Sequence, residues 1–211
     1  MKRLALLGAS GHGKVVADAA LASGWEHIEF FDDAWPECSS NGPWRVSGNT
    51  EALVEQLDRF DGVVVSIGNC ATRLRKHQAL ASLGARLTSI VHPRAAISTF
   101  AEIGVGTVIM AGAVINVDAK LGPAVIINTG ATVDHDCVLD EAVHVAPGAN
   151  LSGNVTVGRC SWVGVGACVR QGVRIGDNVM VGAGAVVVRD LASNLTVAGN
   201  PARALKPRHT N

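Results

Sequence analysis

The sequence has no excess of charge of either sign. Its 211 residues include 18 Lys and Arg and 18 Asp and Glu, and its isoelectric point is about 7.0. Proteins that bind nucleic acid or an anionic membrane surface usually carry a basic patch, so the balanced charge argues against both partners. The sequence also lacks an apolar run of about 18 or more residues, which a membrane-spanning helix needs. We therefore expect a soluble protein with no membrane or nucleic-acid partner.

The five cysteines form no known spacing pattern. Their number is odd and no C-x-x-C pair occurs, which argues against a disulfide framework and against a zinc ribbon. The first ten residues look superficially like a signal peptide, but their apolar segment runs only from Leu4 to Leu7 and a glycine-rich turn follows. We interpret this segment as a buried first strand and expect a cytoplasmic location.

Residues 97–187 carry an uninterrupted six-residue repeat. An aliphatic side chain stands at every sixth position from Ile97 to Val187, and in the parallel series from Ala101 to Ala185 every sixth residue is Ala, Thr, Val, Cys or Ser. An α-helix repeats at about 3.6 residues and a strand at about 2, so a period of six requires a chain that turns a corner once per hexad. This period is typical of β-helices. We expect three short strands per coil, coils stacked about 4.8 Å apart and aliphatic columns inside.

The first 93 residues lack the repeat. We therefore expect a separate α/β domain at 1–93, followed by the β-helix at 94–211. Strands are expected at 2–7, 27–31, 62–67 and 86–91, and helices after the glycine turn, from Thr50 to Leu57 and at 71–83. Alternating strands and helices form a small Rossmann-like parallel sheet with helices on its faces.

Ligands of such sheets bind beyond the carboxyl ends of the strands. The residues expected at these ends are Ser10, Gly11, His12, Asp32, Asp33, Gly68 and Asn69. The turn has the spacing G-x-x-G-x-G, whereas dinucleotide-binding folds use G-x-G-x-x-G, and about 90 residues supply only half of such a fold. A mononucleotide or a nucleotide sugar therefore fits better than a nicotinamide dinucleotide. The alternative is that the glycines only permit a tight strand-to-helix turn.

Two histidines of the repeat are candidates for chemistry. His135 stands between two aspartates, which can orient the imidazole and raise its basicity, so His135 is a candidate general base. Neither His135 nor His144 has an inward hexad position, so both are expected at corners or on outer faces, where a histidine is often only solvated. Residues eighteen apart are equivalent on adjacent coils, which puts Gly153 beside His135 and leaves space there for a substrate.

Zinc is the rival role for these histidines, because some hexapeptide β-helices bind zinc through three of them. The histidines available here are His92, His135 and His144, spaced by 43 and 9 residues. The long-then-four-residue spacing of the zinc enzymes is absent. Since a catalytic zinc site needs three convergent protein ligands, we expect no metal.

Several short motifs occur in order along nearly the whole chain. Besides the hexads, they are GASGHG (8–13), FDD (31–33), IGN (67–69), NT (128–129), DHD (134–136), VHV (143–145), GNV (153–155) and GNPAR (199–203). Together they resemble the hexapeptide-repeat family of bacterial sugar O- and N-acyltransferases. That family includes sialic acid O-acetyltransferases and N-acetyltransferases of UDP-linked 4-amino-4,6-dideoxy sugars.

The resemblance implies a left-handed parallel β-helix assembled as a homotrimer, with the co-substrate acetyl-CoA in the groove between neighbouring β-helices. His135 matches the proton acceptor of the family, and Asp136 matches an acidic neighbour, usually Glu, that raises its basicity. The residues that match acetyl-CoA contacts are His144, Gly153, Val165 and Ala183. Those that match nucleotide-sugar contacts are Ser10, Gly11, His12, Asp32, Asp33 and Gly68.

The implied function is an acetyl-CoA-dependent N-acetyltransferase that acts on the 4-amino group of a nucleotide-linked amino-deoxy sugar, with UDP as the favoured carrier. Direct transfer is expected, because no serine or cysteine stands out as a nucleophile beside a base. Two alternatives stay open. One is an O-acetyltransferase for a sialic acid or related glycan. The other is a non-catalytic trimeric scaffold whose first domain binds a nucleotide.

Overall fold

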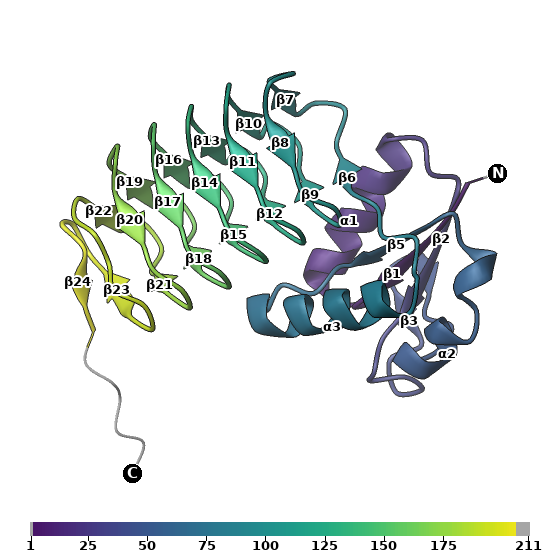
Figure 1. Cartoon of the computed structure of the whole chain (residues 1–211). Helices are drawn as coiled ribbons and strands as arrows, with labels where there is room; N and C mark the ends of the chain where they lie inside the picture. The colour runs from purple at the N-terminus through teal and green to yellow at the C-terminus, as the bar shows by residue number, and fades with distance from the viewer. Residues whose placement is uncertain (1, 206–211) are drawn as a thin grey trace, which may run out of the picture.

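The computed structural model describes residues 2–205, which form two units (Figure 1). The N-terminal unit is a small parallel sheet with flanking helices, and the C-terminal unit is a left-handed parallel β-helix. The fold class predicted from the sequence is therefore confirmed. No helix within residues 2–205 is both long enough and apolar enough to cross a membrane.

The N-terminal sheet has the strand order β2-β1-β5, and neighbouring strands are parallel. Side chains of β1 alternate between its two faces. Leu4 and Leu6 pack with α1, whereas Leu7 packs around Phe31 and Phe60. The elements of this unit are β1 (Arg3–Leu7), α1 (Gly11–Ala22), β2 (His27–Phe31), β3 (Ser40–Asn41), β4 (Trp44–Arg45), α2 (Thr50–Val54), the 3-10 helix η1 (Leu57–Arg59), β5 (Gly62–Val65) and α3 (Cys70–Ser82).

Two expectations for this unit differ from the structure. The helix expected from Thr50 to Leu57 ends at Val54, and η1 follows it as a separate turn. The strand expected at 86–91 does not close the small sheet, because only Leu87 forms a bridge, to Val63. The end of this segment, β6 (Ile90–Val91), pairs instead with the first coil of the β-helix. The reason is visible in the repeat, since Val91 stands six residues before Ile97.

The coils of the β-helix contribute short strands to three parallel sheets, and paired residues of adjacent coils are 18 apart in sequence, except at the last coil, where β21 and β23 pair 16 apart. We call these sheets faces 1, 2 and 3 in chain order. Face 1 contains β6, β9 (Val108–Ile109), β12 (Ile126–Ile127), β15 (His144–Val145), β18 (Trp162–Val163), β21 (Met180–Val181) and β23 (Thr196–Ala198), with β24 (Arg203–Ala204) antiparallel at its end. Face 2 contains β7 (Ala96–Ile97), β10 (Val114–Ile115), β13 (Thr132–Val133), β16 (Asn150–Leu151), β19 (Cys168–Val169) and β22 (Val186–Val187). Face 3 contains β8 (Glu102–Ile103), β11 (Lys120–Leu121), β14 (Val138–Leu139), β17 (Thr156–Val157) and β20 (Arg174–Ile175).

The hexad residues form the core of the β-helix. From Ile109 to Val187, every sixth residue is 4% exposed or less, and each fully buried aliphatic side chain contributes about 1.5–3 kcal/mol. Between residues 106 and 184, each corner between two faces contains one residue in the left-handed backbone conformation, which Gly, Asn and Asp adopt most readily. At the corner between faces 2 and 3 this position is occupied by Asp118, Asp136, Asn154 and Gly172.

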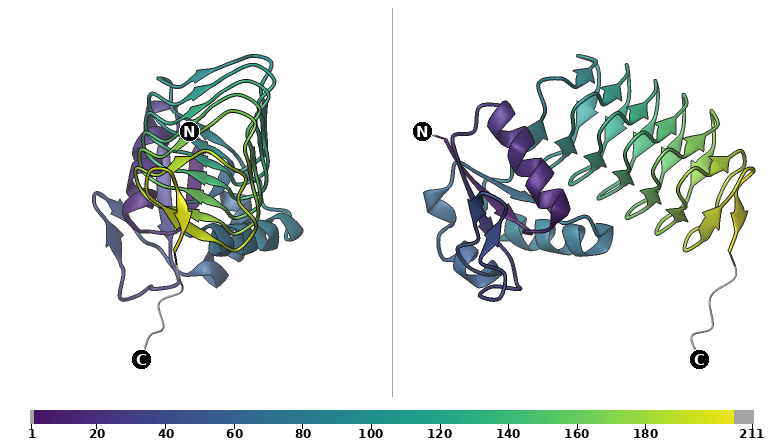
Figure 2. Two further views of the ribbon diagram at one scale, coloured as in Figure 1. Left: turned by 90° about the vertical axis from the view of Figure 1, so that its left-hand side faces the viewer. Right: turned by 180° about the vertical axis from the view of Figure 1, so that it is seen from behind.

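The N-terminal unit packs on the first coils of face 1 (Figure 2). Val16 of α1 and Phe30 of β2 share one buried cluster with Val108 and Ile126, whose side chains point outward from the β-helix. Helix α3 lies along the corner between faces 3 and 1. The carboxyl ends of the parallel strands are thereby held close to β15, the strand that carries His144.

Candidate active site

His135 lies at the corner between faces 2 and 3, in the turn that joins β13 to β14. Its Nδ1 is 2.7 Å from Oδ2 of Asp136, and its side chain is 55% exposed. Asp134 accepts a hydrogen bond from the backbone N–H of His135, which fixes the turn. The hydrogen bond to Asp136 raises the pKa of His135 above its ordinary value. When Nδ1 donates to Asp136, Nε2 is left with a free lone pair, as a general base requires.

Gly153 stands beside His135 on the next coil, as the sequence predicts. A Cβ atom at Gly153 would lie 2.5 Å from both Cε1 and Nε2 of His135. The missing side chain therefore makes room for the imidazole itself. The backbone N–H of Gly153 makes no hydrogen bond within the described part of the chain, so it is available as a donor beside His135.

His144 lies on the outer side of face 1 but is buried. It is only 3% exposed, because the N-terminal unit covers it. Its ring centroid is 3.9 Å from that of Trp162 and 5.9 Å from that of His12. Burial, reinforced by the nearby Arg73, lowers the pKa of His144 to about 3 and that of His12 to about 4. Both rings are therefore neutral at physiological pH, and each has one buried nitrogen with no hydrogen-bond partner among residues 2–205.

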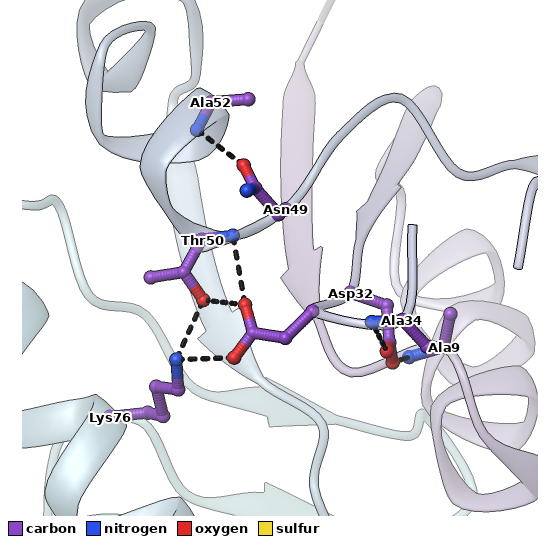
Figure 3. Close-up of polar contacts among 8 residues, drawn as sticks. Ala9, Asp32, Ala34, Asn49, Thr50, Ala52 and Lys76 are labelled. Atoms are coloured by element: carbon purple, nitrogen blue, oxygen red, sulfur yellow. Dashed lines mark hydrogen bonds and ion pairs between the residues drawn. The ribbon is translucent and has the colours of Figure 1, made fainter. Parts of the chain in front are cut away.

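The two aspartates after β2 are both engaged in polar contacts at the carboxyl edge of the sheet (Figure 3). Asp32 accepts hydrogen bonds from the backbone N–H groups of Ala9 and Ala34, which ties the glycine turn to the end of β2. Asp33 accepts from Lys76 Nζ at 2.6 Å and from Thr50. Desolvation acts in the opposite direction, but these hydrogen bonds keep the pKa of Asp33 below its ordinary value. A cavity of about 210 Å³ is lined by Leu7, Gly8, Asp32, Asp33, Ile67, Thr72, Arg75 and Lys76.

The remaining substrate candidates surround the start of two helices. Ser10 is the N-cap residue of α1 and makes no side-chain cap, so the first N–H groups from Gly11 onward stay available to an anion. Gly68 precedes α3 and helps to line a cavity of about 420 Å³ between this helix and face 1. Trp162 and Met180 lie on the opposite wall of that cavity.

A single chain does not bring all the predicted residues together. His135, Asp136 and Gly153 lie at the corner opposite face 1, whereas His144 and the nucleotide-sugar candidates lie at or on face 1. Val165 and Ala183 are stacked at the corner between faces 1 and 2. A larger groove of about 550 Å³ on face 3 contains none of these residues.

The basic residues of α3 were not among the residues predicted from the sequence. Arg73, Arg75 and Lys76 follow the IGN motif within a few residues, and two of them line the cavity beside Asp33. This basic run directly after a strand end was the available signal. Within residues 2–205, no group of three or more His, Cys, Asp or Glu side chains is arranged to hold a metal ion.

Comparison with known proteins adds independent evidence. Residues 3–80 match the PglD N-terminal domain family. The acetyltransferase domain of PglB from Neisseria gonorrhoeae FA1090, solved in complex with acetyl coenzyme A, is 45% identical, with a TM-score of 0.92 over 97% of this chain and 99% of that chain. PerB from Caulobacter crescentus, solved with CoA and GDP-perosamine, is 36% identical, with a TM-score of 0.92 over 98% of both chains.

A third relative is UDP-N-acetylbacillosamine N-acetyltransferase from Bacillus subtilis (strain 168). It is 36% identical over 114 residues, and this alignment covers 53% of the present chain but only 52%, about half, of that enzyme. The two solved structures match along almost their full lengths. The chain therefore belongs to the hexapeptide-repeat family of bacterial sugar acyltransferases.

Proposed function

We propose that this protein transfers the acetyl group of acetyl-CoA to the 4-amino group of a nucleotide-linked amino-deoxy sugar. The observation that carries the proposal is the pairing of His135 Nδ1 with Asp136 at 2.7 Å on an exposed corner, which leaves Nε2 free to accept a proton. Relatives that match over nearly the whole chain support it, because one was solved with acetyl coenzyme A and another with CoA and GDP-perosamine.

In the proposed mechanism the transfer is direct. The amine nitrogen attacks the thioester carbonyl, a C–N bond forms, and the C–S bond breaks. His135 Nε2 takes the proton that the amine loses, and this proton passes to the departing CoA thiolate. The free N–H of Gly153 is the proposed donor to the developing oxyanion, because it lies beside the base and has no other acceptor within residues 2–205.

The nucleotide sugar is proposed to bind at the carboxyl edge of the N-terminal sheet. The uncapped start of α1 offers N–H groups for a phosphate, while Arg75 and Lys76 add positive charge around the cavity beside Asp33. UDP is the proposed carrier, since the Bacillus subtilis relative is named for a UDP-linked sugar. GDP is the alternative, since PerB was solved with GDP-perosamine.

We further propose that the protein acts as a homotrimer whose active sites form between chains. The support is geometric, because His135 lies at the corner opposite the face that carries the N-terminal unit. The test is to mix two inactive variants, His135→Asn and Lys76→Glu. If each site combines residues of two chains, mixed oligomers of these variants should recover activity. A wild-type protein that is fully active and has the mass of a monomer by light scattering would refute the proposal.

The substrate assignment is tested by release of free CoA with a panel of acceptors. UDP- and GDP-linked 4-amino-4,6-dideoxy sugars are compared with the matching 4-hydroxy sugars and with a free sialic acid. The proposal expects turnover only with the amino sugars. Preferential turnover of a hydroxyl acceptor would establish an O-acetyltransferase, and absence of acetyl-CoA binding would establish a non-catalytic scaffold.

A further inference from the structure

Helix α3 meets the corner between faces 3 and 1 with three side chains that together contact four successive coils. His77 packs on Gly106, where a Cβ atom would lie 2.5 Å from the imidazole. One helical turn earlier, Arg73 donates hydrogen bonds to Ala124 and Ala142 on the next two coils. A further turn back, Cys70 Sγ lies 3.9 Å from the carbonyl oxygen of Ser161 on the following coil. A helical turn advances about 5.4 Å and stacked coils about 4.8 Å, so successive turns of α3 meet successive coils.

Arg73 is the centre of this contact. Its side chain is 1% exposed, and all five of its N–H donors have carbonyl acceptors. Nε donates to Ala124 at 2.8 Å, and the two terminal nitrogens share the remaining four acceptors. These are Ile67 at 2.8 Å, Gly68 at 2.8 Å, Ala142 at 2.7 Å and Val143 at 3.4 Å. Within the described residues Arg73 has no carboxylate partner, so it is a buried cation held mainly by peptide carbonyls, with the thiols of Cys70 and Cys160 nearby.

Four of the five carbonyls belong to two segments that border the proposed site, and the fifth, Ala124, lies on the preceding coil. Ile67 and Gly68 lie in the loop between β5 and α3, and Gly68 is a predicted nucleotide-sugar contact. Ala142 and Val143 directly precede His144, a predicted acetyl-CoA contact. The β-helix coil is fixed by backbone hydrogen bonds to the coils before and after it, for example from Ile126 N–H to Val143 and from His144 N–H to Ser161. The loop is therefore the partner that would move if Arg73 were lost.

We propose that Arg73 is a positioning residue that holds the nucleotide-sugar loop, residues 67–69, in register with the coil of His144. It touches neither substrate and acts through the loop carbonyls. The inference rests on the proposed function, because it assigns to Arg73 the alignment of the sugar nucleotide with the acetyl donor. A guanidinium suits this role because its rigid fork of five donors serves two segments at once, whereas a lysine ammonium has only three donors.

The test is a comparison of Arg73→Lys and Arg73→Gln with His77→Gln. His77 is the matched control, because it lies on the same helix and the same corner but does not touch the loop. For the Arg73 variants we expect a KM for the nucleotide sugar that is roughly tenfold higher or more. The affinity for acetyl-CoA, measured by calorimetry, should change by less than about twofold, since its proposed groove lies on the β-helix. The KM for the nucleotide sugar should rise less in Arg73→Lys than in Arg73→Gln.

His77→Gln is expected to lower the melting temperature without raising the KM for the nucleotide sugar relative to the affinity for acetyl-CoA. Equal KM values in folded Arg73→Lys and wild-type protein would overturn the inference, and so would the same rise in KM for His77→Gln. If Arg73→Lys does not fold, the Arg73→Gln measurement decides by the same criterion, with binding of UDP and GDP alone as a readout that needs no turnover. Wild-type protein that acetylates no amino sugar would instead refute the proposed function.

Discussion

At the scale of single residues, Asp136 meets two requirements at once. Its φ of 59° places it in the left-handed region, which Asp tolerates better than longer side chains, and its carboxylate reaches Nδ1 of His135. The family resemblance gives Glu as the usual residue at this position. In this chain the shorter Asp still makes the contact, because the turn itself directs the carboxylate toward the imidazole.

Replacement of Asp136 by Asn should separate these two requirements. Asn keeps the size and the tolerance for a left-handed backbone but removes the charge that raises the pKa of His135. Because the neutral imidazole is the active form, the wild-type rate falls as pH drops through this raised pKa. In Asp136→Asn the fall should occur at lower pH, with a smaller kcat on the plateau. The pH dependence of kcat/KM checks this, and an acidic limb that stays in place or moves to higher pH would contradict it.

Gly153→Ala should impair catalysis much more than stability. The added Cβ would overlap the imidazole of His135, which is the end of an exposed, movable side chain, so the ring can turn aside at little cost in folding. We expect turnover to fall by about tenfold or more through loss of the base geometry. Val117→Ala, at the equivalent position two coils before Gly153, is the control and should keep wild-type turnover. Equal turnover of Gly153→Ala and the control would show that the ring position is unimportant.

At the scale of elements, each two-residue strand of the β-helix has one side chain that points into the core and one that points outward. On β14, Leu139 is 1% exposed in the core, whereas its neighbour Val138 is 44% exposed on face 3. Leu139→Ala should lower the free energy of unfolding by about 2–5 kcal/mol, because it leaves a cavity in a close-packed column. Val138→Ala should change it by about 0.5 kcal/mol or less. Urea denaturation of both variants decides this, and similar losses would argue against the assignment of the core.

The sequence predicted the strands of the β-helix well because their period is strict, but it did not predict which face the N-terminal unit covers. The information was present at a longer period. The outward residues of face 1 in the first coils are Ile90, Val108 and Ile126, whereas those of face 3 begin with Glu102 and Lys120. Comparing every eighteenth residue would have shown that face 1 is apolar on both sides. The same comparison would have placed His144, next in that series, beneath the N-terminal unit.

At the scale of the whole molecule, the candidate site could be predicted only in part. The His135 and Asp136 pair follows from adjacency in sequence, and Gly153 from the eighteen-residue coil. The contact between His12 and His144 depends on how the two units dock, which no local pattern encodes. The basic run after β5 points to Arg73, but its acceptors depend on the same docking, since Ala124 and Ala142 lie 51 and 69 residues away.

The buried histidines at the junction of the two units should make the protein sensitive to acid. Unfolded histidines titrate near about 6.5, whereas the folded pKa values are about 4 for His12 and about 3 for His144. Between these values the unfolded state binds more protons, so the free energy of unfolding falls as pH is lowered from about 6.5. Thermal melting of wild-type and His144→Asn protein at about pH 7 and about pH 5 measures this. Between these two pH values the melting temperature of the wild type should fall more than that of the variant. An equal fall would contradict the prediction.

The central claim is that His135 removes the proton from the attacking amine. The most direct test is the steady-state turnover of His135→Asn with acetyl-CoA and a nucleotide-linked 4-amino sugar, alongside calorimetry of acetyl-CoA binding and a melting curve. We expect turnover reduced by at least about 10²-fold in a folded protein that still binds acetyl-CoA. Turnover close to that of the wild type would contradict it.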